Sequence, residues 1–163
     1  ESESRGLGDV YKRQGNNVAN SLMMCGAMLG VNVQICSPEG FNADSQIVEK
    51  AKSLSEFGSK ISISNDPLKA VKEAQVIYTD VWASMGQEEE HMKRQKIFEN
   101  YKVDQKLIGL ADKEAIILHC LPAHRGEEIT EEALESQSSN VFDQAENRLH
   151  VQQALLAVQL GGV

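Results

Sequence analysis

The sequence predicts an α/β domain in which short apolar strands alternate with amphipathic helices. Segments typical of strands occur at residues 31–36, 60–64, 75–79, 115–118 and 141–142. Segments with the apolar spacing of helices separate most of them. Because strands that are joined through helices lie parallel and are covered on both faces, we expect a single domain with a doubly wound, Rossmann-like parallel sheet.

Composition agrees with one globular domain and excludes some partners. A chain of 163 residues with 41% hydrophobic and 25% charged residues is ordinary for such a domain. The formal net charge of −8 argues against nucleic acid, because phosphate binding needs a concentrated basic surface. No apolar run approaches the ~20 residues that cross a bilayer, so we expect no membrane contact.

The cysteines and histidines indicate neither a disulfide framework nor a metal motif. Cys25, Cys36 and Cys120 are sparse and lack Cys-x-x-Cys spacing, and Cys36 is expected in the core. The Glu90-His91 pair lacks the His-Glu-x-x-His spacing of a zinc helix. We therefore expect no metal, no cofactor and a cytoplasmic location, where thiols stay reduced.

Residues 1–14 show neither a helix nor a strand period, and we expect them to be a tail. The Gly6-Leu7-Gly8 segment could suggest a dinucleotide fingerprint. No apolar strand precedes it, however, and Tyr11 occupies the place of the third glycine.

A helix is expected to begin near Asn17, because apolar residues then recur on one helical face up to Gly30: Val18, Leu22, Cys25 and Leu29. Asn16 or Asn17 can cap this helix. The first turn of a helix also binds anions such as a carboxylate, so the cap could be a ligand contact. The alternative is a plain helix cap.

The later helices are expected at 44–57, from Pro67 to 73, from Glu88, at 104–111 and at 131–135, with Thr130 as the N-cap of the last. A final helix places four apolar residues on one face: Val151, Ala154, Leu155 and Val158.

The strand at 75–79 delivers Asp80 to the sheet edge where ligands bind in open α/β folds. In the loop that follows, Asp80 could pair with an ammonium group and Ser84 could bind a polar head group. Gly86 would let the Met85 backbone approach a ligand closely. Alternatively, Asp80 caps the next helix and Trp82 is a core aromatic residue.

The strand at 115–118 leads to Cys120 at the same expected edge. Nearby His119, His124 and Arg125 would favour the thiolate form of Cys120, which is the reactive form. The alternative is a buried, inert cysteine.

Arg148 follows the last expected strand. Its planar guanidinium matches the oxygens of a phosphate or a carboxylate. The alternative is an ion pair within its own helix, with Glu146 or Asp143.

Four segments in this order resemble the signatures of ornithine carbamoyltransferases: Gly15-Asn16-Asn17, Asp80-Val81-Trp82-Ala83-Ser84-Met85-Gly86, His119-Cys120-Leu121-Pro122-Ala123-His124-Arg125-Gly126-Glu127-Glu128, and Phe142-Asp143-Gln144-Ala145-Glu146-Asn147-Arg148. The resemblance covers residues 15–163 and implies the ornithine-binding half of such an enzyme.

By this resemblance, Asn17, Asp80, Ser84 and Met85 hold L-ornithine. Cys120 is the catalytic cysteine beside the reacting amine, and together with Asp80 it favours the neutral nucleophile.

The same resemblance places Cys120, Leu121 and Arg148 at the carbamoyl phosphate site. His119 and Arg125 then order the loop rather than act on substrate. The loop around Ser84 resembles a mobile lid.

The resemblance also implies parts that this sequence lacks. The family's Ser-Thr-Arg-Thr segment for carbamoyl phosphate is absent, and trimer contacts belong largely to the half that contains it. We expect a homotrimeric or larger parent enzyme and a monomeric fragment without turnover.

The family has an apolar strand that ends in Gly-Asp-Gly before the asparagines, whereas this chain has Lys12-Arg13-Gln14. We therefore expect residues 1–14 to be foreign to the domain and the sheet to lack its first strand.

Three alternatives stay open at this point. One is an amino-acid-binding module without catalysis, and another is a carbamoyltransferase for a related amine. A nucleotide-binding domain is disfavoured by the missing glycine fingerprint.

Overall fold

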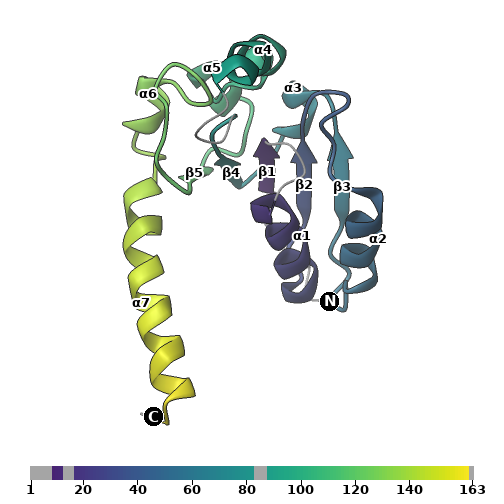
Figure 1. Cartoon of the computed structure of the whole chain (residues 1–163), viewed down its shortest axis with the longest axis vertical. Coiled ribbons are helices and arrows are strands. Elements are labelled where there is room, and N and C mark those ends of the chain that lie inside the picture. The colour runs from purple at the N-terminus through teal and green to yellow at the C-terminus, as the bar shows by residue number, and fades with distance from the viewer. Residues whose placement is uncertain (1–8, 13–16, 83–87, 162–163) are drawn as a thin grey trace.

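The computed structural model describes residues 9–12, 17–82 and 88–161. Its centre is a five-stranded sheet in the order β3-β2-β1-β4-β5 (Figure 1). The strands are β1 (Asp9–Lys12), β2 (Val33–Cys36), β3 (Ile61–Ser64), β4 (Val76–Thr79) and β5 (Ile116–His119). All four strand pairs are parallel, which confirms the predicted fold class.

The expectation that the sheet lacks its first strand is wrong. Tyr11 of β1 is in register with Ile35 of β2 on one side and with Tyr78 of β4 on the other. The strand escaped sequence analysis because four residues of mixed polarity are too few to show a period. Its place in the sheet comes from backbone pairing with two neighbours. That residues 1–14 are foreign to the domain stays a prediction, and residues 1–8 and 13–14 lie outside the described residues.

Helices follow the strands as the pattern predicts, with tighter bounds. They are α1 (Asn17–Leu29), α2 (Ser45–Ser53), α3 (Pro67–Ala70), α4 (Glu88–Phe98), the 3-10 helix η1 (Glu99–Tyr101), α5 (Gln105–Ile108), α6 (Glu131–Leu134) and α7 (Val141–Gln159). The Thr130 hydroxyl accepts a hydrogen bond from the Ala133 amide at 3.2 Å, which confirms the predicted cap of α6. Asp44, Asp66 and Asp104 cap α2, α3 and α5 in the same way.

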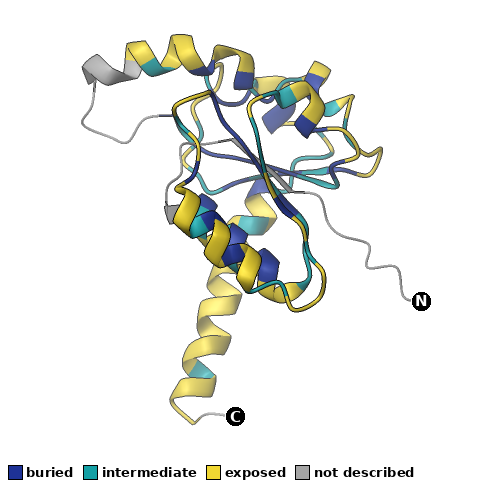
Figure 2. Cartoon of the chain, turned by 90° about the vertical axis from the view of Figure 1, so that its right-hand side faces the viewer, coloured by how far each residue is buried: buried dark blue, intermediate teal, exposed yellow. Residues whose placement is uncertain are grey.

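The sheet separates two cores, because neighbouring residues of a strand point to opposite faces. Ile77 packs on one side with Phe98 and Ile117, whereas Tyr78 packs on the other side with Met23 and Ile35. Helices α1 and α2 cover the second side, and α3, η1, α5 and α6 contribute to the first. In Figure 2 the buried segments, in dark blue, lie on the strands and on parts of the helices around them. The domain is therefore doubly wound, and Cys36 lies in its core as predicted.

The expected strand at 141–142 is instead the first turn of α7. The segment just before it pairs with β5: the Ile117 amide donates to the Ser138 carbonyl at 2.7 Å, and the Asn140 amide donates to the Ile117 carbonyl at 2.9 Å. Val141 is then fully buried as the helix begins. Two apolar residues in sequence could not distinguish these outcomes.

The apolar face expected on the final helix lies exposed. Helix α7 extends away from the sheet, and its residues are exposed along most of its length (Figures 1 and 2). Val151 is 66% exposed, Leu155 55% and Val158 67%. Within the described part of the chain, no helix is both long and apolar enough to cross a membrane.

Phe98 should be a main determinant of stability, because it is 1% exposed and its ring lies 5.1 Å from that of Phe41 and 6.0 Å from those of Trp82 and Tyr101. We expect Phe98→Ala to lower the free energy of unfolding by about 3–5 kcal/mol in chemical denaturation. Phe57→Ala is the control: Phe57 is 65% exposed, and its loss should change stability by less than ~0.5 kcal/mol. Equal effects of the two variants would contradict this account of the core.

Candidate functional site

The candidate site lies at the carboxyl ends of β1, β4 and β5. Strand order reverses between β1 and β4, and in open α/β sheets this is where a crevice for ligands forms. Thr79 of β4 is in register with Lys12 of β1 on one side and with His119 of β5 on the other. Consequently Asp80 and Cys120, the next residues along β4 and β5, lie at the same edge of the sheet, as the sequence predicts.

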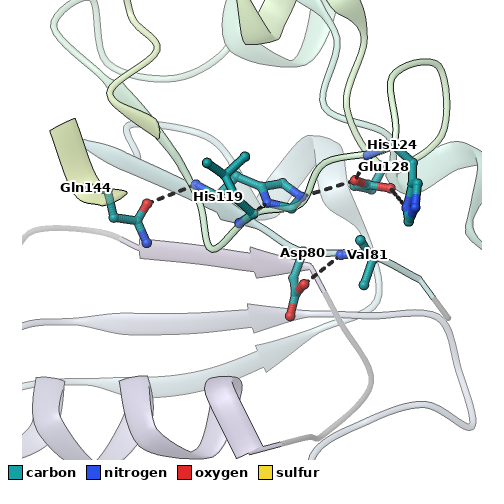
Figure 3. A network of polar contacts seen from close by, with 7 residues as sticks. Asp80, Val81, His119, His124, Glu128 and Gln144 are labelled. Carbon is teal, nitrogen blue, oxygen red and sulfur yellow. Dashed lines mark hydrogen bonds and ion pairs between the residues drawn. The ribbon is translucent and has the colours of Figure 1, made fainter. Parts of the chain in front are cut away.

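Asp80 is a buried carboxylate at this edge, with 3% of its surface exposed. Its Oδ1 accepts a hydrogen bond from the Val81 amide at 2.7 Å (Figure 3). A carboxylate held this way at the end of a strand can bind a cationic group of a ligand.

Cys120 and Asp80 share a third neighbour, Tyr78 of β4. Burial raises the pKa of the Tyr78 phenol, and negative charge on Cys120 and then on Asp80 raises it further. The phenol also forms a hydrogen bond with Cys120, and it accepts one from Gln144 Nε2 at 3.1 Å. Tyr78 therefore stays protonated at neutral pH and is an uncharged polar group beside Asp80 and Cys120.

The basic groups expected to favour the Cys120 thiolate are paired with carboxylates instead. His119 and His124 both lie beside Glu128. Arg125 makes ion pairs with Glu131 at 3.3 Å and Glu135 at 2.7 Å. That these groups favour the thiolate of Cys120 stays a prediction, and adjacency in sequence did not reveal their carboxylate partners.

His119 and Glu128 form a fully buried pair, with Nε2 and Oε1 3.1 Å apart (Figure 3). The His119 Nδ1 accepts a hydrogen bond from the Leu121 amide at 2.8 Å. This partner assigns the ring proton to Nε2, which donates it to Glu128. The neutral tautomer of His119 thus satisfies both of its ring nitrogens.

This pair holds the loop that follows Cys120. Leu121 has a φ of +53°, which is an uncommon backbone conformation for a residue with a side chain. The hydrogen bond to His119 supports that conformation, and the Glu128 carboxylate accepts a second bond from the His124 amide at 2.6 Å. The main-chain amide of His119 in turn donates to Gln144 Oε1 at 3.0 Å.

Sequence reasoning missed three members of this network: Tyr78, Glu128 and Gln144. Tyr78 lies within an apolar strand pattern, and Gln144 lies in a helix. Glu128 follows another glutamate, a pattern typical of a solvated surface. The one signal in the sequence was that an apolar residue, Ile129, directly follows Glu128. The structure shows that Ile129 is buried.

Other predicted site residues are less fully described. Ser84 and Met85 lie outside the described residues. Asn17 begins α1, which follows the central strand β1, so the expected helix start is present at this edge.

Arg148 lies on the exposed part of α7. The alternative of an ion pair within the helix is not seen among the residues that the structure describes. Glu146 lies 3.5 Å from His150 instead, and Asp143 accepts a hydrogen bond from Asn140 at 3.1 Å. The described part of the chain does not bring Arg148 into contact with Asp80 or Cys120.

A groove elsewhere on the domain does not coincide with this group. A groove of about 420 Å³ lies between α3 and α5, with Asp66, Lys102 and Asp104 among its lining residues. Neither Asp80 nor Cys120 lines it, and the chemistry of its mixed charges indicates no single ligand.

Comparison with known proteins assigns the chain to a family. The family model for the Asp/Orn binding domain of aspartate/ornithine carbamoyltransferases matches residues 7–159. The ornithine carbamoyltransferase of Prochlorococcus marinus is 62% identical over 158 residues, which are 97% of this chain and 50% of that protein. That of Thermococcus kodakarensis is 50% identical over 98% of this chain and 51% of its own length.

A solved structure gives the same result for the fold. The ornithine carbamoyltransferase from Pyrococcus furiosus superposes with a TM-score of 0.92 at 48% identity, over 98% of this chain and 51% of that one. The chain thus spans about half the length of the relatives that it matches. It belongs to the aspartate/ornithine carbamoyltransferase family, as a member of the Asp/Orn binding domain.

Proposed function

We propose that this chain is the ornithine-binding half of an ornithine carbamoyltransferase. The whole enzyme would transfer the carbamoyl group of carbamoyl phosphate to L-ornithine, giving L-citrulline and phosphate in arginine biosynthesis or catabolism. The observation that supports this most is the meeting of Asp80 and Cys120 at adjacent strand ends.

In the reaction, the side-chain amine of ornithine attacks the carbamoyl carbon. A C–N bond forms, the C–O bond to phosphate breaks, and the amine loses a proton. Asp80, buried at the sheet edge, binds the incoming ammonium group, and Cys120 lies beside the amine once it is neutral. Asn17, Ser84 and Met85 complete the ornithine site. Because Tyr78 stays protonated, it adds no further charge there.

Carbamoyl phosphate would bind beside Cys120 and Leu121, with Arg148 supplying positive charge. The left-handed Leu121, fixed through His119 and Glu128, presents the backbone of this loop in a defined position. Arg148 contacts neither Asp80 nor Cys120 in the described part of the chain, so its role depends on packing that this half does not supply. No cofactor takes part.

Exposed apolar residues on α7 support a role for a second half of the enzyme. The helix exposes several large apolar side chains, and so does its C-cap residue: Phe142, Leu149, Val151, Leu155, Leu156 and Val158, with Leu160 at the cap. Apolar patches of this kind mark surfaces that another surface covers. We assign the carbamoyl phosphate-binding half of the enzyme to this exposed face of α7. The whole enzyme would be a homotrimer or a larger assembly in the cytoplasm, whereas the isolated fragment would be a monomer.

The isolated chain is expected to lack turnover. Half of the enclosing site is absent, so positioning and charge neutralisation of the phosphate are lost. A citrulline assay with both substrates should give no signal above background, and calorimetry should detect at most weak ornithine binding. Citrulline formation at an enzyme-like rate would contradict this, whereas tight ornithine binding without turnover would favour the amino-acid-binding module.

In the intact enzyme that contains this domain, Asp80→Asn should lower kcat/KM for ornithine by about 10²-fold or more, because the neutral amide cannot pair with the substrate ammonium. Steady-state kinetics with varied ornithine measures this effect. Asp112→Asn is the matched control, since Asp112 is exposed and its side chain accepts a hydrogen bond from the nearby Glu114 amide. Equal kinetics of the two variants would refute the role of Asp80.

The acceptor role of Glu128 can be separated from its charge. In the intact enzyme, Glu128→Gln keeps an oxygen that can accept from His119 and His124. It should therefore retain most activity. Glu128→Ala frees the loop and should lower kcat/KM by about 10²-fold, because a small misplacement of reacting groups has effects of this size. Similar losses in both variants would show that the loop is not held through this hydrogen bonding.

A further inference from the structure

The loop after β5 brings together three side chains of the types that bind metal ions. They are His124, Glu127 and Glu128, and one ligand atom from each lies within 4.8 Å of the others. Clusters of acidic residues are common at protein surfaces, so this grouping alone does not make a site. Its buried member distinguishes it.

Glu128 is fully buried, and its two carboxylate oxygens have different environments. Oε1 accepts from His119 Nε2 at 3.1 Å and from the His124 amide at 2.6 Å. Oε2 is buried and has no hydrogen-bond partner among the described residues. A buried anionic oxygen without a donor is costly, and a bound cation would remove that cost.

Oε2 points toward the His124 ring, with its nearest nitrogen, Nδ1, 3.8 Å away (Figure 3). Two ligands of one tetrahedral Zn²⁺ at usual bond lengths lie about 3.4 Å apart. A closure of about 0.4 Å would therefore place both atoms on one ion. His124 can make this movement because its side chain is 48% exposed. The same exposure gives an ion a path from solvent.

The donor set selects the class of ion. An imidazole nitrogen with two carboxylate oxygens suits Zn²⁺ and similar transition metals, whereas Mg²⁺ and Ca²⁺ prefer oxygen ligands alone. Three protein ligands leave a fourth position for water. The hydrogen bonds that Oε1 accepts would fix the orientation of the Glu128 carboxylate. Metal-binding carboxylates are commonly held by such hydrogen bonds.

We propose that His124, Glu127 and Glu128 bind one zinc-class divalent cation through His124 Nδ1, a Glu127 carboxylate oxygen and Glu128 Oε2. This revises the expectation of no metal, which depended on sequence motifs that this loop does not contain. None of its ligands is assigned to either substrate, and Glu128 holds the loop after Cys120 through its other oxygen, Oε1.

Zinc binding to the 163-residue chain tests the site. Cysteines could bind zinc themselves, so the measurement uses a Cys25→Ser/Cys120→Ser background, and Cys36 is fully buried. Titration with ZnCl₂ against a chromophoric chelator should give one site per chain, and the melting temperature should rise with zinc. With CoCl₂, the visible spectrum should show nitrogen and oxygen ligation without a thiolate charge-transfer band.

His124→Ala and Glu127→Gln should each weaken zinc binding at least about tenfold, since even outer-shell changes have effects of this order. Both positions are at least partly exposed, so the variants should fold, which circular dichroism checks. His150→Ala is the matched control: His150 lies 3.5 Å from Glu146 on exposed α7 without a buried carboxylate, and its loss should leave binding unchanged.

Two results would overturn the site. One is the absence of zinc binding in the background chain, which would mean that His124 satisfies Glu128 by itself as an ion pair. The other is zinc binding in the background chain that His124→Ala and Glu127→Gln leave unchanged, which would place the ion on other side chains.

Discussion

Parallel pairing of β4 with β1 and β5 is the constraint on which the rest of the site depends. Register between Thr79, Lys12 and His119 fixes where three chain segments leave the sheet. Since backbone hydrogen bonds set this register, Asp80 and Cys120 meet whatever the surrounding loops do. Tyr78 lies one residue before the end of β4. Negative charge on Cys120 and on Asp80 raises the pKa of its phenol, so this side chain interacts with both groups. The chemistry proposed for the domain depends on this convergence of strand ends, because it places the individual side chains next to one another.

The buried pair of His119 and Glu128 is the second level of organisation. Its hydrogen bonds join the end of β5 to the loop that follows. The pair accepts hydrogen bonds from the main-chain amides of Leu121, which has a left-handed conformation, and of His124. One carboxylate oxygen of Glu128 thus serves the loop beside the candidate active site. The other faces His124 and gives the proposed metal site its anchor. A single buried acid therefore takes part in both proposals, one through each carboxylate oxygen.

The domain also has a surface that its own residues do not cover. Helix α7 begins in the core at Val141 but exposes large apolar side chains over the rest of its length. Arg148 lies on this exposed helix, away from contact with Asp80 and Cys120 in the described part of the chain. Together with relatives of about twice this length, these features support the proposal that another domain covers this helix.

The sequence by itself determined the fold class, most helix starts and the pair of strand ends that bear Asp80 and Cys120. These features depend on local periodicity, on caps such as Thr130 and on polar residues directly after apolar strands, all of which are visible along the chain. Only the tertiary structure decided that residues 9–12 fill the middle of the sheet, that Val141 begins a helix, and that His119 and His124 both lie beside Glu128. The reason is that the partners of a short strand or a buried charge come from distant segments, and local sequence patterns contain no information about them.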